Sequence, residues 1–157
     1  MRRALTYIVV ATAFCPPCSA AKGPSWNQIQ YIGGTIRIKT SRFDWNTTLT
    51  LDGGAIVVEI APATVFIPKK TVRIKPSQVV SLSMGASAWR HVAAVDGAQL
   101  PSKPPALFGL LQDNGFLGIV YDDDAGKRAA ILLDSHFSAA MLQVLMRITG
   151  KPVENSP

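Results

Sequence analysis

Cysteine is nearly absent from this chain of 157 residues, and the two that occur, Cys15 and Cys18, stand close to the N-terminus. So few cysteines exclude a fold built on a disulfide framework. Charged residues are also scarce, at 17%, whereas hydrophobic residues make up 48%. Such a composition can bury a core and excludes a wholly disordered protein. The length corresponds to about one domain.

The sequence also lacks an apolar run long enough to cross a bilayer, which takes about 20 residues. Its longest candidate, residues 4–14, follows two arginines and precedes the small residues 19–21. A basic start, a short apolar run and small residues are typical of a secretory signal peptide. We therefore predict that residues 1–21 are removed on export, by cleavage after Ala21 or alternatively after Ala20. No transmembrane segment would remain in the mature chain.

Cleavage would remove both cysteines, so we do not expect Cys15-Pro16-Pro17-Cys18 to act as a redox pair. The bulky Phe14 before Cys15 also argues against a lipid anchor there. Loss of two arginines and no acid lowers the formal net charge from +6 to +4. We expect an exported protein, periplasmic or extracellular, with no nucleic-acid partner.

Alternating apolar and polar residues predict a succession of short strands after a lead at 22–25. Asp52-Gly53-Gly54 predicts a hairpin turn, since glycine tolerates the positive φ that tight hairpins need. Two runs near the C-terminal end, 116–121 and 129–133, are apolar on both faces and should form central or covered strands. The alternating pattern begins at Trp26, and the predicted strands lie within 36–39, 48–52, 56–60, 72–75, 78–84, 107–111, 116–121 and 129–133.

One helix is predicted at the C-terminal end, with Asp134 or Ser135 as its N-cap and Gly150 just beyond its last turn. Residues 85–105 form a loop-rich insertion, in which 86–95 has room for one or two helical turns. The apolar stripe expected on the C-terminal helix consists of Phe137, Ala140, Met141, Val144, Leu145 and Ile148.

These elements predict a mainly β fold with one C-terminal α-helix. A small barrel of about seven or eight antiparallel strands, capped by that helix, would protect the edges of the sheet. Beside the order of the elements, a set of short motifs covers most of residues 26–153: Trp45-Asn46-Thr47-Thr48-Leu49, Ile67-Pro68, Val72-x-Ile74-x-Pro76-x-x-Val79-x-x-Leu82, Phe116-Leu117-Gly118-Ile119-x-Tyr121-Asp122, Lys127 and Thr149-Gly150-Lys151-Pro152-Val153. In this order and in these motifs the chain resembles bacterial pleckstrin-homology-like domains, including GRAM-like modules, and 154–157 is expected to be a tail. The resemblance implies a partly open barrel but no agreed activity, because such domains bind lipids, peptides or proteins.

The candidate binding residues are the cations Arg37, Lys39, Arg73 and Lys75, which alternate with apolar residues in two predicted strands. If those strands adjoin, the four side chains form a basic surface for an anionic lipid surface or an acidic protein partner. The alternative is a solvated sheet face whose charges deter aggregation.

No catalytic residue, cofactor or metal site is expected. His91 and His136 are the only histidines, and no nucleophile stands at a credible spacing from either. Residues 122–124 are consecutive aspartates, which suits an exposed turn better than a calcium loop. We predict an exported, non-enzymatic binding module. The alternative is a carrier of a small apolar ligand, or a hydrolase-like protein, with a pocket beside residues 85–105.

Overall fold

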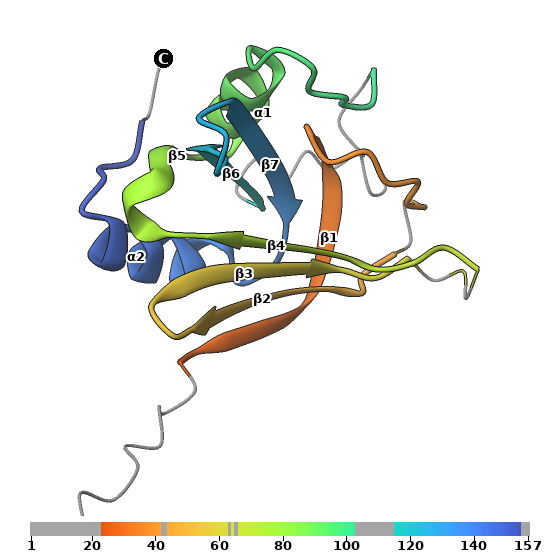
Figure 1. Ribbon diagram of the computed structural model, residues 1–157, viewed down its shortest axis with the longest axis horizontal. Coiled ribbons are helices and arrows are strands. Elements are labelled where there is room, and N and C mark those ends of the chain that lie inside the picture. Colours follow the sequence, from red (N-terminus) through yellow and green to blue (C-terminus); the bar gives the residue numbers. More distant parts are fainter. Residues whose placement is uncertain (1–22, 42–43, 63, 65, 103–114, 155–157) are drawn as a thin grey trace, which may run out of the picture.

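The structure is a computed structural model that describes residues 23–41, 44–62, 64, 66–102 and 115–154 (Figure 1). The expected signal peptide and the strand predicted at 107–111 lie outside the described residues. The described part contains seven strands, two α-helices and one short 3-10 helix. The strands are β1 (Ser25–Gly34), β2 (Thr47–Asp52), β3 (Ala55–Ile60), β4 (Lys70–Ile74), β5 (Val79–Met84), β6 (Phe116–Asp122) and β7 (Arg128–Asp134); the helices are η1 (Pro76–Gln78), α1 (Ala86–Ala93) and α2 (Ser138–Thr149).

All seven strands belong to one antiparallel sheet, in the order β4-β3-β2-β1-β7-β6-β5. The mainly β prediction is therefore confirmed, as is the C-terminal helix. Among the described residues, the outermost strands β4 and β5 do not pair with each other, so the sheet is not closed.

β1 belongs to both halves of the sheet because it changes partner along its length. Residues 25–29 pair with β2, and residues 30–34 pair with β7. The change follows an irregularity between Trp26 and Ile29, where Gln28 has a φ of 56°. Such a bulge bends a strand sharply, and here it turns β2–β4 away from β5–β7.

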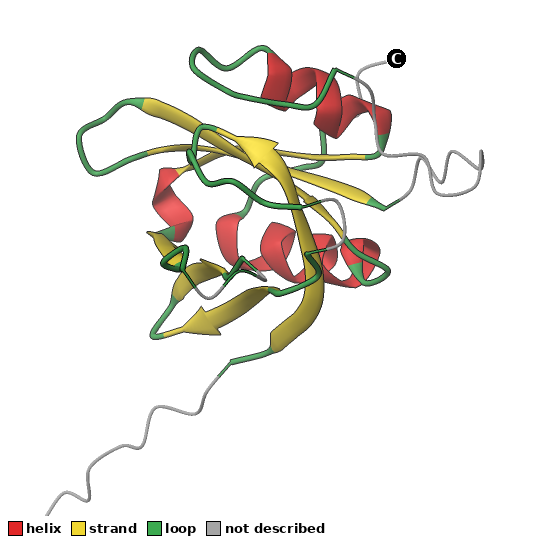
Figure 2. Ribbon diagram, turned by 90° about the vertical axis from the view of Figure 1, so that its right-hand side faces the viewer, coloured by secondary structure: helices red, strands yellow, loops and turns green. Residues whose placement is uncertain are grey.

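The core has two parts, one on each face of β5–β7. The larger part fills the space between β1–β4, β5–β7 and α2, and the smaller part lies under α1. Figure 2 shows α1 on one side of β5–β7 and α2 on the other. β6 and β7 are buried along both faces, which confirms the prediction that they are covered strands.

The hairpin predicted at Asp52-Gly53-Gly54 is present, with φ of 56° and 76° at the two glycines. Asp52 pairs with Ala55 across this two-residue turn. Positive φ at both central residues matches the right-handed twist of the flanking strands. The two glycines therefore predicted the position of this turn, and with it the pairing of β2 with β3, correctly.

The strand predicted at 36–39 is wrong, because β1 ends at Gly34 and the chain then forms an irregular segment. Ile36 and Ile38 nevertheless rest half-buried against the core. The Tyr31 hydroxyl donates to the Ile36 carbonyl at 2.9 Å, so a side chain holds this segment where a neighbouring strand was expected.

Of the two helical predictions, the first is confirmed and the start of the second is wrong. Residues 86–93 form the two turns of α1, within the range where one or two turns were predicted. α2 begins at Ser138, with neither Asp134 nor Ser135 as its N-cap. The Ser135 hydroxyl instead accepts the Phe137 N–H, just before the helix. At the other end Gly150 takes the predicted left-handed conformation.

The predicted stripe on α2 is also displaced. Phe137 and Ala140 are exposed, whereas Ser138 and Leu142 are buried together with Met141 and Leu145. α2 contacts β5, β6 and η1, and this contact selects a face rotated from the one that spacing suggested.

Candidate functional site

Two of the four predicted cations are already paired with carboxylates. Arg73, on β4, lies 3.2 Å from Asp52 and also donates to the Asp52 carbonyl at 2.9 Å. Lys75, just after β4, lies 3.6 Å from Asp124. Both pairs are exposed, so each contributes little to stability. They do neutralise much of the charge that the sequence assigned to this surface.

The other two cations, Arg37 and Lys39, lie on the irregular segment after β1 and are exposed. Neither has an acidic partner within the described ranges of the chain. Ile36 and Ile38 turn inward between them, so alternation predicted correctly that both cations face solvent. The predicted continuous basic face across two adjoining strands is not formed, because these two cations are not on a strand.

The loop between β3 and β4 carries a feature that we did not predict as a site. Phe66 is 92% exposed, the largest exposure of any large hydrophobic side chain in the described residues. Lys69 pairs with Glu59 at 2.8 Å, whereas the exposed Lys70 has no ion-pair partner among the residues that the structure describes. The available sequence signal was an apolar run, Phe66-Ile67-Pro68, followed directly by two lysines.

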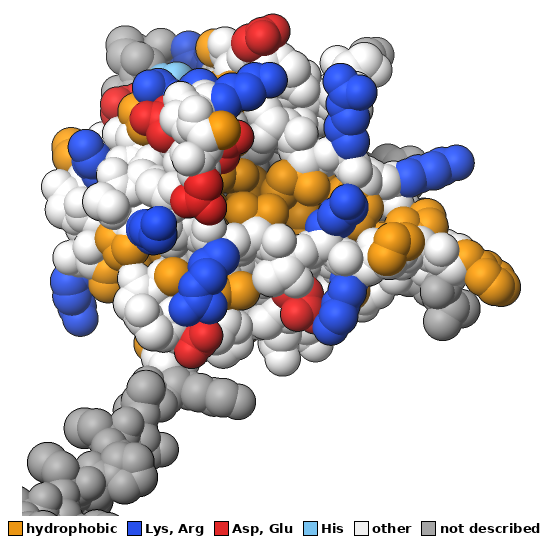
Figure 3. Space-filling model, in the orientation of Figure 1, with side chains coloured by type: hydrophobic (Ala, Val, Ile, Leu, Met, Phe, Trp, Pro, Cys, Tyr) orange, Lys and Arg blue, Asp and Glu red, His pale blue; other side chains and the backbone are white. Residues whose placement is uncertain are grey.

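These features gather at one end of the molecule. The segment after β1 and the β3–β4 loop both lie at the right-hand side of Figure 1, and both face the viewer in Figure 2. Figure 3 shows projecting hydrophobic side chains there, with lysines and arginines beside them. We call Arg37, Lys39, Phe66 and Lys70 the loop end.

Near the start of α2, the His136 ring stacks on Trp45 with ring centroids 6.0 Å apart and planes within 2°. Burial raises the pKa of the neighbouring Asp134, against a smaller lowering effect of His136. The nearby hydroxyls have structural partners, since Ser135 accepts the Phe137 N–H and Ser138 donates to the Ser135 carbonyl at 2.9 Å. No activated nucleophile is therefore assembled from these residues.

The three consecutive aspartates form a hairpin turn, as predicted. Asp122 pairs with Arg128 at 2.7 Å, and Asp123 accepts the N–H groups of Ala125 and Lys127. Asp124 accepts from Gln78 and pairs with Lys75. Over the described part of the chain, no group of three or more His, Cys, Asp or Glu side chains is placed to hold a metal ion.

The alternative function required a pocket beside the insertion, but α1 and the strands beneath it are in close contact. A Cβ atom on Gly118 would lie 2.6 Å from the Ser83 hydroxyl oxygen and 3.1 Å from Ala88. Ser83 and Ala88 are fully buried. This contact leaves no room for a ligand between α1 and β6 at Gly118, and a pocket elsewhere beside residues 85–105 stays a prediction.

Comparison with family models, with curated proteins and with solved structures finds no match to this chain. None of the described helices is long and apolar enough to span a membrane.

Proposed function

We propose that the protein is an exported, non-enzymatic binding module of pleckstrin-homology-like architecture that recognises an anionic lipid surface through its loop end. Seven antiparallel strands followed by a C-terminal helix support the architecture. The single observation that carries the function is that Arg37 and Lys39 lack acidic partners in the described part of the chain and lie at the same end as the loop of Phe66.

The chemistry of the loop end suits a lipid surface because it combines cations with an exposed aromatic side chain. Each lysine or arginine near an anionic membrane contributes about 1 kcal/mol. Arg37, Lys39 and Lys70 together would then supply about 3 kcal/mol, to which partial burial of Phe66 adds an apolar contribution. Such a sum gives weak, reversible and salt-sensitive attachment.

The test is flotation of the mature chain, residues 22–157, with vesicles of neutral phosphatidylcholine or of anionic phosphatidylglycerol. Binding is expected only to the anionic vesicles, and it should fall steeply at high salt. Reversing the two free cations, in Arg37→Glu with Lys39→Glu, should abolish binding while circular dichroism stays unchanged.

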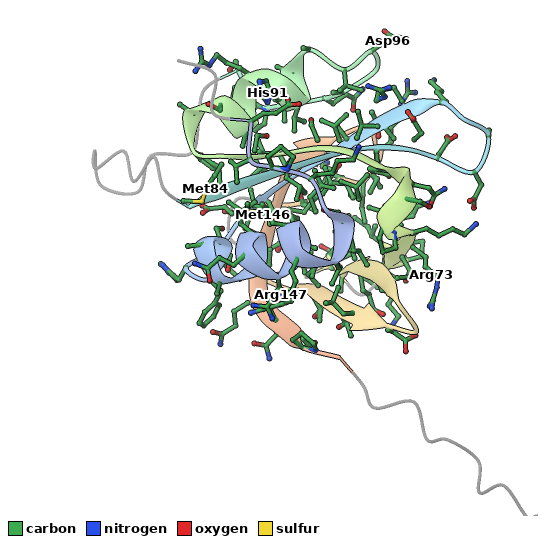
Figure 4. All side chains as sticks on the ribbon, turned by 90° about the vertical axis from the view of Figure 1, so that its left-hand side faces the viewer. Arg73, Met84, His91, Asp96, Met146 and Arg147 are labelled. Carbon is green, nitrogen blue, oxygen red and sulfur yellow. The ribbon has the colours of Figure 1, made fainter. Side chains whose placement is uncertain are left out.

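A matched control reverses two exposed cations on α2 and just after it, in Arg147→Glu with Lys151→Glu. Arg147 lies on α2, away from the loop end (Figures 1 and 4). This control has the same net charge as the first variant and should still bind. Equal loss in both variants would show that net charge governs binding and would refute a defined loop-end site. Absence of wild-type binding at low salt would exclude the lipid surface and favour an acidic protein partner.

A further inference from the structure

The two edge strands of the sheet, β5 and β4, differ in whether another described segment bonds to their outer side. On β5, the C-terminal segment lies along the edge: Val153 forms a parallel bridge with Leu82, and the Glu154 N–H donates to the Leu82 carbonyl at 2.8 Å. Glu154 also lies 3.6 Å from His91 on α1. The edge of β4 has no such cover, since its residues pair with β3 alone in the described structure.

The register identifies which groups of β4 are unpaired. Asp52 and Ala55 flank a two-residue turn, so they form a hydrogen-bonded pair, and such pairs alternate along an antiparallel ladder. Ile56, Val58 and Ile60 therefore bond toward β4, to Ile74, Val72 and Lys70 respectively. The N–H and C=O groups of Thr71 and Arg73 consequently point away from β3, toward the open edge.

The surface beside this edge is apolar on one side and basic on the other. Figure 3 shows hydrophobic side chains open to solvent directly above β4, over β7 and β1. Val72 faces that side and is half-buried. On the opposite side, Arg73 points outward into solvent (Figure 4), and Lys75 shares its face by alternation.

We propose that the free edge of β4 binds an extended acidic segment of a partner protein as an additional antiparallel strand. Strand addition of this kind gains affinity from main-chain hydrogen bonds and specificity from alternate side chains. Apolar residues of the segment would lie beside Val72, and acidic residues between them would lie beside Arg73 and Lys75. This site meets the loop end at Lys70 but uses the main-chain groups of Thr71 and Arg73. Its occupant is a protein segment, whereas the loop end is proposed to bind lipid.

Charge complementarity selects this occupant over a second copy of the chain. Lys69, Lys70, Arg73 and Lys75 place four cations within seven residues along the edge, and three of them form exposed ion pairs with Glu59, Asp52 and Asp124. Two β4 strands laid side by side would bring these like charges together, which is unfavourable. An acidic strand would instead form ion pairs with Arg73 and Lys75. Their present pairs with Asp52 and Asp124 are exposed and contribute little to stability, so rearranging them costs little free energy.

The test uses the full-length chain and a seven-residue probe peptide of alternating valine and glutamate, capped at both ends. Amide hydrogen exchange is measured by NMR with and without the peptide at millimolar concentration. The amides of Thr71 and Arg73 should become protected, whereas those of Val72 and Ile74, already bonded to β3, should change little. A peptide with lysine in place of glutamate should protect neither.

Variants separate the edge from general charge effects. Thr71→Pro removes an outward N–H without breaking the pairing with β3, and it should weaken peptide binding at least about fivefold. Thr71→Ala keeps that N–H and should bind normally. Arg73→Glu should weaken binding, whereas Arg128→Glu should not, although both arginines form a comparable exposed pair with an aspartate.

Three results would overturn the proposal: protection at another site or at none, equal binding of the lysine peptide, or an unaffected Thr71→Pro variant. If Thr71→Pro fails to fold, the exchange pattern of the wild-type chain and the Arg73→Glu comparison with its Arg128→Glu control still decide.

Discussion

Ser83 offers a sharp test of the structure because its hydroxyl is buried without a hydrogen-bond partner. The residue is fully buried on β5, and the described structure offers its oxygen neither donor nor acceptor. Removing a polar group from water without a new hydrogen bond costs about 1–3 kcal/mol. Ser83→Ala eliminates that cost and leaves the methyl-sized Cβ atom in place. We therefore expect this substitution to stabilise the protein.

The same substitution at Ser138 provides the matched control, since Ser138 is equally buried. Its hydroxyl donates to the carbonyl groups of Ser135 and Gly115. Ser138→Ala should therefore destabilise the protein by about 1–2 kcal/mol. The two variants differ in sign for one physical reason, which is whether the buried hydroxyl is satisfied.

Thermal and urea unfolding of the two variants and the wild type would measure these changes. A gain of about 1 kcal/mol corresponds to a rise in Tm of about 4 °C for a domain of this size. Destabilisation of Ser83→Ala by as much as Ser138→Ala would mean that Ser83 is hydrogen-bonded in solution. The account of the contact between β5, β6 and α1 would then be wrong.

Three further predictions concern the packing and titration of single residues. Gly118→Ala should destabilise by about 1–3 kcal/mol in urea unfolding, because the new Cβ meets the backbone of Ala88 at 3.1 Å; a neutral effect would mean that α1 is not so close. Asp134→Asn should stabilise the protein near neutral pH, because burial raises the pKa of this carboxyl and its ionised form therefore lowers the free energy of unfolding. That loss disappears as the pH falls from the raised folded pKa toward 3.8, the ordinary value of an aspartate. The wild type should therefore gain stability as the pH falls through this range, and the variant should not. Tyr31→Phe should cost about 1 kcal/mol by unfolding and speed amide exchange at Ile36 and its neighbours, and unchanged exchange there would contradict the anchoring role of the hydroxyl.

The sequence predicted those elements whose signals are local. The turn at Gly53-Gly54 depends on two adjacent glycines, and the double burial of β6 and β7 follows from uninterrupted apolar runs. The strand predicted at 36–39 failed because alternation reports which side chains are buried, and it does not report whether a neighbouring strand is present. Ile36 and Ile38 are half-buried, as alternation implies, but a tyrosine hydroxyl holds the backbone there.

The candidate site was harder to predict because its charges depend on contacts between distant residues. Arg73 is 21 positions from Asp52, and Lys75 meets an aspartate from another hairpin, so neither neutralisation is visible in spacing. Arg37 and Lys39 have no ion-pair partner among the described residues, and the segment that carries them is held by the Tyr31 hydroxyl of β1 where a partner strand was expected. Whether these two cations are ion-paired, like the exposure of Phe66, depends on the tertiary arrangement and cannot be predicted from residue spacing.

The loop end and the open edge both arise from the way β1 divides the sheet. By changing partner near Gln28, β1 directs β2–β4 away from β5–β7 and leaves the sheet unclosed between β4 and β5. The C-terminal segment bonds to β5 at Leu82, whereas no described residue bonds to the outer edge of β4. β4 begins at Lys70, directly after the loop that carries Phe66, so one hairpin supplies residues to both proposed surfaces. Membrane attachment at the tip of that hairpin and strand addition along its edge would share the Lys70 side chain, whereas the main-chain groups of Thr71 and Arg73 would serve strand addition alone.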